Sequence, residues 1–307
     1  MQFTNVLPIA LTLVMSPLLL GIINRTKAMM GGRNGAPLLQ PYYDLFKLLH
    51  KGAVYSRTTT WVFRAGPIIS LAGCVLAATL IPLGSCEALI SFDGDLILLA
   101  YLLGLGRLCT VLAALDTGSP FEGMGASREV MFSALAEPAL LLGLAALARN
   151  TGAMSLTPMH FALADGAWTV SGLTLALVTV ALLVVFLAEN SRIPVDDPNT
   201  HLELTMIHEV MVLDHGGPDF AFILYGAAIK LWVLGALIID LVLARSTGHA
   251  ALDLGIALAG MFALAVLVGL IESTMARLRM PRVPQLLVGA TALSALALVL
   301  EFGGIGK

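Results

Sequence analysis

Residues 188–220 read AENSRIPVDDPNTHLELTMIHEVMVLDHGGPDF and form a polar island between two long apolar runs. The island holds seven of the chain's twenty acidic residues and three of its six histidines, against a single base, Arg192. These residues are Glu189, Asp196, Asp197, Glu203, Glu209, Asp214 and Asp219, with His201, His208 and His215. Ionisable groups at the edge of a hydrocarbon layer are costly unless they are paired, hydrated or covered by protein. The island therefore predicts a functional or docking surface beside a membrane.

The rest of the chain is far more apolar than a soluble domain. Of its 307 residues, 58% are hydrophobic and 12% are charged, and the mean hydropathy is +0.91, whereas soluble domains carry about 25% charged residues. We therefore expect a polytopic membrane protein, all-α, with residues 1–307 forming one membrane domain. The N-terminus has no basic region before its apolar run, so we expect it to be retained as the first helix.

Eight segments are long and apolar enough to cross a membrane, which takes about 20 residues. They are roughly 6–23, 62–83, 95–115, 130–148, 169–188, 220–244, 251–271 and 285–302. An even number places both termini on one side. Twelve bases lie in the loops of the opposite side, against three on the terminal side, Arg149, Arg245 and Lys307. The positive-inside rule predicts that the termini are outside the cytoplasm and that the island is a cytoplasmic loop between helices five and six.

An amphipathic segment runs from Pro37 to Lys51. Proline suits the first turn of a helix, and Leu38, Tyr42, Leu45 and Leu49 recur at helical spacing opposite the charged residues of the segment. We expect a helix that lies along the membrane interface without crossing it. Taken alone, the stretch is also typical of a flexible turn followed by a solvated helix.

Five charged residues lie within the apolar segments or at their ends: Arg107, Glu137, Lys230, Asp240 and Glu272. They are candidates for a proton path, or they pair with one another and only fix helix packing, and the sequence leaves both interpretations open. Glu137 precedes Pro138, which frees a backbone carbonyl one turn earlier and leaves room for water. Residues 116–129, DTGSPFEGMGASRE, are expected to be a cytoplasmic loop. We do not expect this segment to bind a nucleotide, because no strand precedes its glycines.

No metal site or cofactor is expected in this chain. Cys74, Cys86 and Cys109 lie far apart, without the spacing of an iron–sulfur or zinc site. In the island we expect a turn around 192–198 and a short helix over Thr200–Leu213. His201 and His208 would share a face of this helix, but no carboxylate clearly converges on them, so interface histidines are favoured over metal ligands.

Two motifs resemble the membrane subunit that respiratory complex I (as NADH dehydrogenase subunit 1) shares with the energy-converting membrane-bound [NiFe] hydrogenases. The first is Gly35 followed by residues 40–47, QPYYDLFK, and the second is residues 192–196, RIPVD, followed by Glu203 and Leu204. Where quinone-reducing members carry phenylalanine and two more glutamates, this chain has Val195, Asn199 and His201. The island therefore resembles the hydrogenase-4 and formate hydrogenlyase branch, and the resemblance argues against quinone reduction.

The resemblance implies a non-catalytic subunit of a bacterial or archaeal cytoplasmic membrane. Its partners would be the hydrogenase large and small subunits and an iron–sulfur protein on the cytoplasmic side, antiporter-like membrane subunits and the lipid bilayer, but no nucleic acid. The [NiFe] site and the iron–sulfur clusters would lie in the partners. The residues expected to dock the hydrophilic arm are Arg33, Gln40, Asp44, Lys47, Arg192, Asp196, Asp197 and His201.

We further expect a hydrated path for protons or sodium ions from the docking platform toward the membrane centre. Its candidates are Glu137, Glu189, Glu203, Asp240, Lys230 and Glu272, because carboxylates kept from bulk water can hold a proton near neutral pH. Two alternatives remain open. One is a quinone-binding subunit, and the other is a stand-alone ion transporter, although the two halves of the chain show no convincing repeat of the kind transporters carry.

Overall fold

The computed structural model describes residues 3–164, 167–196, 206–243 and 247–303. Over these residues the protein is all-α, and they contain no β-strand. Its long helices are α1 (Phe3–Met30), α3 (Trp61–Thr79), α4 (Asp95–Asp116), α5 (Pro120–Thr151), α7 (Ala167–Glu189), α8 (Gly217–Leu243), α9 (Ala250–Thr274) and α10 (Val283–Gly303). Shorter elements are α2 (Gln40–Leu49), α6 (Leu156–Ala164) and the 3₁₀ turns η1 (Glu209–Val212) and η2 (Met280–Arg282).

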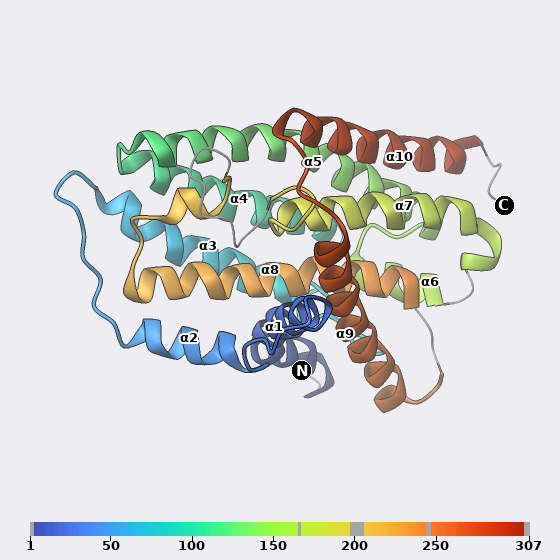
Figure 1. Cartoon of the computed structure of the whole chain (residues 1–307). Helices are drawn as coiled ribbons and strands as arrows, with labels where there is room; N and C mark the ends of the chain where they lie inside the picture. The colour runs from blue at the N-terminus through green and yellow to red at the C-terminus, as the bar shows by residue number, and fades with distance from the viewer. Residues whose placement is uncertain (1–2, 165–166, 197–205, 244–246, 304–307) are drawn as a thin grey trace.

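The eight long helices confirm the predicted number of membrane spans, since each is long and apolar enough to cross a membrane. Helix α8 is the most buried of them and runs through the middle of the bundle, with α3 and α7 beside it and α1 and α9 crossing it obliquely (Figure 1). The core around α8 includes Ile23, Leu99, Leu175 and Trp232, all nearly inaccessible to solvent. Helices from both halves of the chain thus contribute side chains to one shared interior.

Helix α2 confirms the amphipathic segment, but it is shorter than the predicted Pro37–Lys51. It begins at Gln40 with a proline in its first turn and buries none of its residues. It lies beside α8 and next to α1 (Figure 1). Gly21 allows this approach, because a Cβ at that position would meet the carbonyl oxygen of Leu38.

The prediction that residues 116–129 form a loop is wrong for most of this segment. Helix α5 begins at Pro120, shortly after Gly118 with its positive φ of 71°. The glycines and charged residues of this segment suggested a loop, but Gly125 lies within a helix at a point of close packing. A Cβ at Gly125 would overlap Val210 and come within 2.9 Å of the Ile207 carbonyl oxygen. The start of α5 is therefore a packed helical surface on which the island rests.

The island does not contain the predicted helix over its described residues. Only Glu209–Val212 are helical, as the 3₁₀ turn η1, and residues 197–205 lie outside the described part of the chain. Met211 packs with residues of α4 and α5, and the His215 ring stacks on Phe63 of α3 at 3.9 Å. The Asp214 amide donates to Glu122 at the start of α5. Packing against three spans thus decides the conformation of this short segment.

Candidate functional site

A charged cluster lies between α4, α5 and α7, and Arg107 of α4 is its centre. The Arg107 Nη2 atom is 3.2 Å from Glu189 Oε1 at the end of α7, and its Nη1 atom is 3.3 Å from Glu137 Oε1 of α5. Its Nε atom lies 3.9 Å from Glu129 Oε1, a second α5 carboxylate. The Arg107 side chain is only 10% exposed. One guanidinium therefore holds three carboxylates from two neighbouring helices inside a membrane bundle.

Two further groups join this cluster. Lys230 Nζ of α8 is 3.8 Å from Glu189 Oε2, and His208 Nδ1 of the island is 3.3 Å from Glu129 Oε2. We call these six residues, Arg107, Glu129, Glu137, Glu189, His208 and Lys230, the central cluster. Burial, and then the Lys230 ammonium, lower the pKa of His208 to about 4. The imidazole is therefore neutral at pH 7, and the three carboxylates of the cluster face two cations.

The central cluster contains polar atoms that lack a hydrogen bond within the described chain. They are Arg107 Nε and Nη1 and Glu189 Oε2. Buried polar groups are nearly always hydrogen-bonded, to protein or to water. Each of these three atoms lies 3.3–3.9 Å from an oppositely charged atom of the cluster, so their interactions are ion pairs without a well-formed hydrogen bond.

A second charged group ties the island to α1 and α9. Glu272 of α9 has a fully buried side chain and forms ion pairs with Lys27 Nζ of α1 at 2.7 Å and with Arg192 Nη1 at 3.3 Å. Glu272, a predicted path residue, and Arg192, a predicted docking residue, thus form an ion pair. Arg192 is itself only 8% exposed, so its described contacts hold the island against the bundle.

Asp196 organises the backbone of the island. Its Oδ1 atom is 2.9 Å from Arg277 Nη2, and its Oδ2 atom accepts the amides of Ile207 and His208 at 3.2 and 3.3 Å. The residue is 3% exposed. Asp196 is thus held by a base from the loop that follows α9. The first loop does reach the island, since a Cβ at Gly217 would lie 2.8 Å from the Gly52 carbonyl oxygen.

The other predicted docking residues lie on and before α2. Arg33, Asp44 and Lys47 are exposed or half-buried, as is Gln40. The Gln40 amide donates to Asp44 Oδ1 at 2.8 Å. Asp197, His201 and Glu203 lie outside the described residues. The structure thus separates the predicted docking residues into an accessible group around α2 and a buried group, Arg192 and Asp196.

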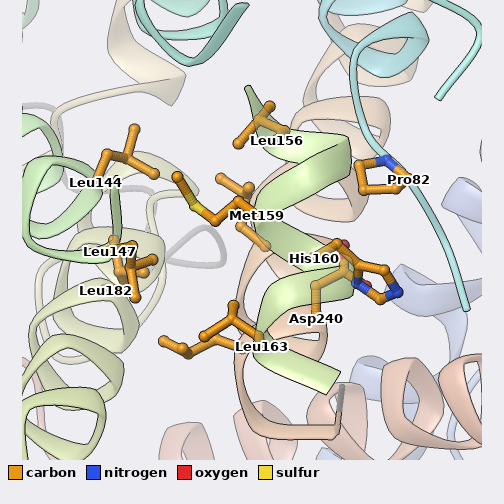
Figure 2. A pocket seen from close by; sticks show the side chains of 11 residues that line it. Pro82, Leu144, Leu147, Leu156, Met159, His160, Leu163, Leu182 and Asp240 are labelled. Carbon is orange, nitrogen blue, oxygen red and sulfur yellow. The ribbon is translucent and has the colours of Figure 1, made fainter. Parts of the chain in front are cut away.

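Asp240 is remote from the central cluster. It lies ten residues beyond Lys230 on α8, which is about 15 Å along a helix. Figure 2 shows it beside His160 of α6, at a small cavity of about 20 Å³ lined mostly by leucines. His160 Nδ1 is 3.4 Å from Asp240 Oδ1, and Nε2 donates to the Gly84 carbonyl. Burial alone would lower the pKa of His160, but the Asp240 carboxylate and the other partners of the ring outweigh burial and raise this pKa.

Several members of these groups had no signal in the sequence. Glu129 was assigned to a loop, and His160 is a lone histidine in an apolar segment. Lys27 and Arg277 resemble ordinary bases that follow a membrane span. The predicted path residues Glu137, Glu189 and Lys230 do come together. Within the described ranges, no group of three or more His, Cys, Asp or Glu side chains could hold a metal ion.

Two curated relatives match nearly the whole chain. Formate hydrogenlyase subunit 4 of Escherichia coli is 30% identical over 295 residues, 92% of this chain and 93% of the relative. Hydrogenase-4 component C of the same organism is 32% identical over 299 residues, 95% of this chain and 93% of the relative. A more distant match is an NADH-quinone oxidoreductase subunit of Anaplasma phagocytophilum, 27% identical over 221 residues, 67% of this chain and 63% of the relative.

The fold is similar to that of a solved structure. A chain of the membrane-bound sulfane sulfur reductase, an archaeal respiratory membrane complex, superposes with a TM-score of 0.83 at 21% identity, covering 97% of this chain and 98% of the other. The profile of the NADH dehydrogenase family matches residues 3–302. This multi-pass membrane protein therefore belongs to the NADH dehydrogenase family, and it is similar to the two hydrogenase proteins above.

Proposed function

We propose that this chain is the membrane subunit of a hydrogenase complex related to complex I, and that it links redox chemistry in a hydrophilic arm to the movement of protons or sodium ions. The observation that carries this proposal is the central cluster, a buried charge network that reaches from the island into the middle of the bundle. Two hydrogenase relatives that match 92% and 95% of the chain support the choice of complex.

The island is connected to the central cluster through a short series of contacts. Asp196 accepts the His208 amide, and the His208 ring faces Glu129. Glu129 lies beside Arg107, which also meets Glu137 and Glu189. A displacement of the island therefore moves the neutral His208 ring relative to Glu129 and changes the polar contacts of this carboxylate, which lies beside Arg107. Movement of a docked arm would reach the membrane interior by this route.

The charge balance of the central cluster would allow it to bind and release an ion. At neutral pH the three carboxylates of the cluster face the two cations Arg107 and Lys230, because His208 is uncharged. Buried unpaired charge is strongly unfavourable. A proton on one carboxylate, or a bound cation, restores the balance, and its site depends on which carboxylate lies nearest a cation. The network can therefore take up and release one ion when the island moves.

The residues expected to dock the arm divide into two roles. Arg33, Gln40, Asp44 and Lys47 offer side chains on the surface around α2. Asp197 and His201, also expected to dock the arm, lie outside the described residues. Arg192 and Asp196 hold the island in shape through Glu272 and Arg277. We place this surface on the cytoplasmic side and the chain termini outside, from the excess of bases in the loops on the side of the island. The [NiFe] site and iron–sulfur clusters belong to the partners.

Inverted membrane vesicles carrying the complex test the coupling role. Glu189→Gln keeps size and hydrogen bonding but removes one charge from the central cluster. We expect hydrogen evolution near the wild-type rate and a loss of most ion translocation. The matched control is Glu301→Gln, since Glu301 of α10 is also a buried glutamate but bonds Asn150 away from the cluster. Unchanged translocation in Glu189→Gln would contradict the proposal.

The composition of the purified complex tests the choice of partners. After mild detergent extraction, we expect nickel, iron and hydrogenase subunits to copurify with this chain. Stoichiometric quinone in place of nickel would instead favour a quinone-binding subunit. A chain that purifies alone and still transports ions would favour a stand-alone transporter.

A further inference from the structure

Glu137 is a carboxylate exposed in the middle of a membrane span. It is the eighteenth residue of the 32-residue helix α5, and 49% of its side chain is exposed. Its Oε1 atom lies 3.6 Å from where a Cβ of Gly104 would be, at the middle of α4. Within the described part of the chain, Arg107 of α4 is its ion-pair partner. A half-exposed charge at this depth is strongly unfavourable against hydrocarbon, so a polar group from outside this chain is expected to cover it.

The surface around Glu137 is suited to another helix. Along α4, the exposed positions Tyr101, Leu105 and Leu108 follow one another at helical spacing. Toward the far end of the bundle from the island, this face continues as a groove of about 470 Å³. The groove is lined by Leu96, Ile97, Leu141, Ala145, Ala148, Arg149, Gly152 and Met154. Small side chains on one side of such a groove let a second backbone approach closely.

We propose that this α4–α5 face is the seat of a transmembrane helix of a neighbouring membrane subunit, and that this helix presents a lysine, arginine or other hydrogen-bond donor to Glu137. The inference rests on the proposed function for the identity of the partner as a subunit of the same complex. Its basis is charge complementarity at Glu137 itself, because this carboxylate is 49% exposed whereas the other two carboxylates that Arg107 meets are only 6–7% exposed.

Two other occupants fit these observations less well. A phospholipid keeps its charged headgroup at the membrane surface, and its acyl chains offer no donor to a carboxylate at mid-membrane. A second copy of this chain, placed on the same face by a twofold axis that passes near Glu137, would bring the two Glu137 carboxylates together. Like charges in contact would oppose that dimer. A helix with a donor at the depth of Glu137 satisfies both the charge and the groove.

Photo-crosslinking in membranes that contain the complete complex tests the contact directly. A photoreactive phenylalanine analogue replaces Leu141, which lines the groove, or Leu105 on the neighbouring α4 stripe. The matched control is Leu267 of α9, because it has the same exposed fraction as the other two, 43%. We expect both test positions to capture the same transmembrane peptide of one copurifying subunit, and the control not to capture that peptide.

A charge reversal adds a second measurement. In Glu137→Lys, the yield of the Leu141 crosslink should drop about tenfold or more, because a like charge then faces the partner's donor, whereas Glu137→Gln should retain it. Adducts with lipid only, or with a second copy of this chain, would overturn the inference, and so would an unchanged yield in Glu137→Lys. These assays report contact and not transport. A translocation result for Glu189→Gln therefore tests the proposed function separately from this interface.

Discussion

Replacing Asp196 by asparagine should loosen the island without unfolding the bundle. The carboxylate is 3% exposed and holds Arg277 at 2.9 Å and two backbone amides at 3.2 and 3.3 Å. Removing one partner of a buried ion pair costs about 3–5 kcal/mol. Arg277 is 18% exposed and asparagine keeps an acceptor oxygen, so the lower end, about 3 kcal/mol, applies to local opening. This corresponds to roughly a 100-fold larger fraction of open island.

Hydrogen–deuterium exchange measures this opening at the affected atoms. The amides of Ile207 and His208 donate directly to Asp196, so their protection factors should fall about 100-fold, while amides in the middle of α8 stay protected. Asp44→Asn is the control, because it makes the same chemical change at an exposed site on α2. Wild-type protection of Ile207 and His208 in Asp196→Asn would refute the reasoning that this carboxylate holds the island.

Three further outcomes are expected. The pKa of His208 in the folded chain, about 4, lies below its ordinary value of 6.5. The unfolded chain therefore binds more protons than the folded chain between these values, and stability should fall as pH decreases from about 6.5 to 4. The melting temperature of His208→Asn should depend less on pH in that range. Gly125→Ala places a methyl group against Val210 and the Ile207 carbonyl. It should destabilise the complex by about 1–3 kcal/mol, which would be measured as a lower melting temperature. Gly123→Ala is the control and should be neutral, because no atom lies within 4 Å of the new Cβ. Replacing the three cysteines by alanine should leave the iron content of the complex unchanged, and a proportional loss of iron would contradict the assignment of all clusters to partner subunits.

The sequence alone determined the membrane architecture, the amphipathic α2 and the place of the island in the chain. These features are local and linear, because a span is a run of about 20 apolar residues and an amphipathic helix is a periodic pattern. The family also followed from two short motifs, around residues 35–47 and 192–204. The loop predicted over residues 116–129 failed because glycine and charge occur both in loops and in tightly packed helix ends.

Only the tertiary structure decided which charges meet. Glu272 pairs with Lys27, a residue near the other end of the chain. Arg107 contacts carboxylates from two other helices, and Asp240 lies beside His160. Such pairings depend on the crossing angle and rotation of each helix, which are set by how side-chain ridges and grooves fit between neighbours. A hydrophobicity pattern shows that a helix crosses the membrane, but it leaves open which way a single charged side chain on that helix points.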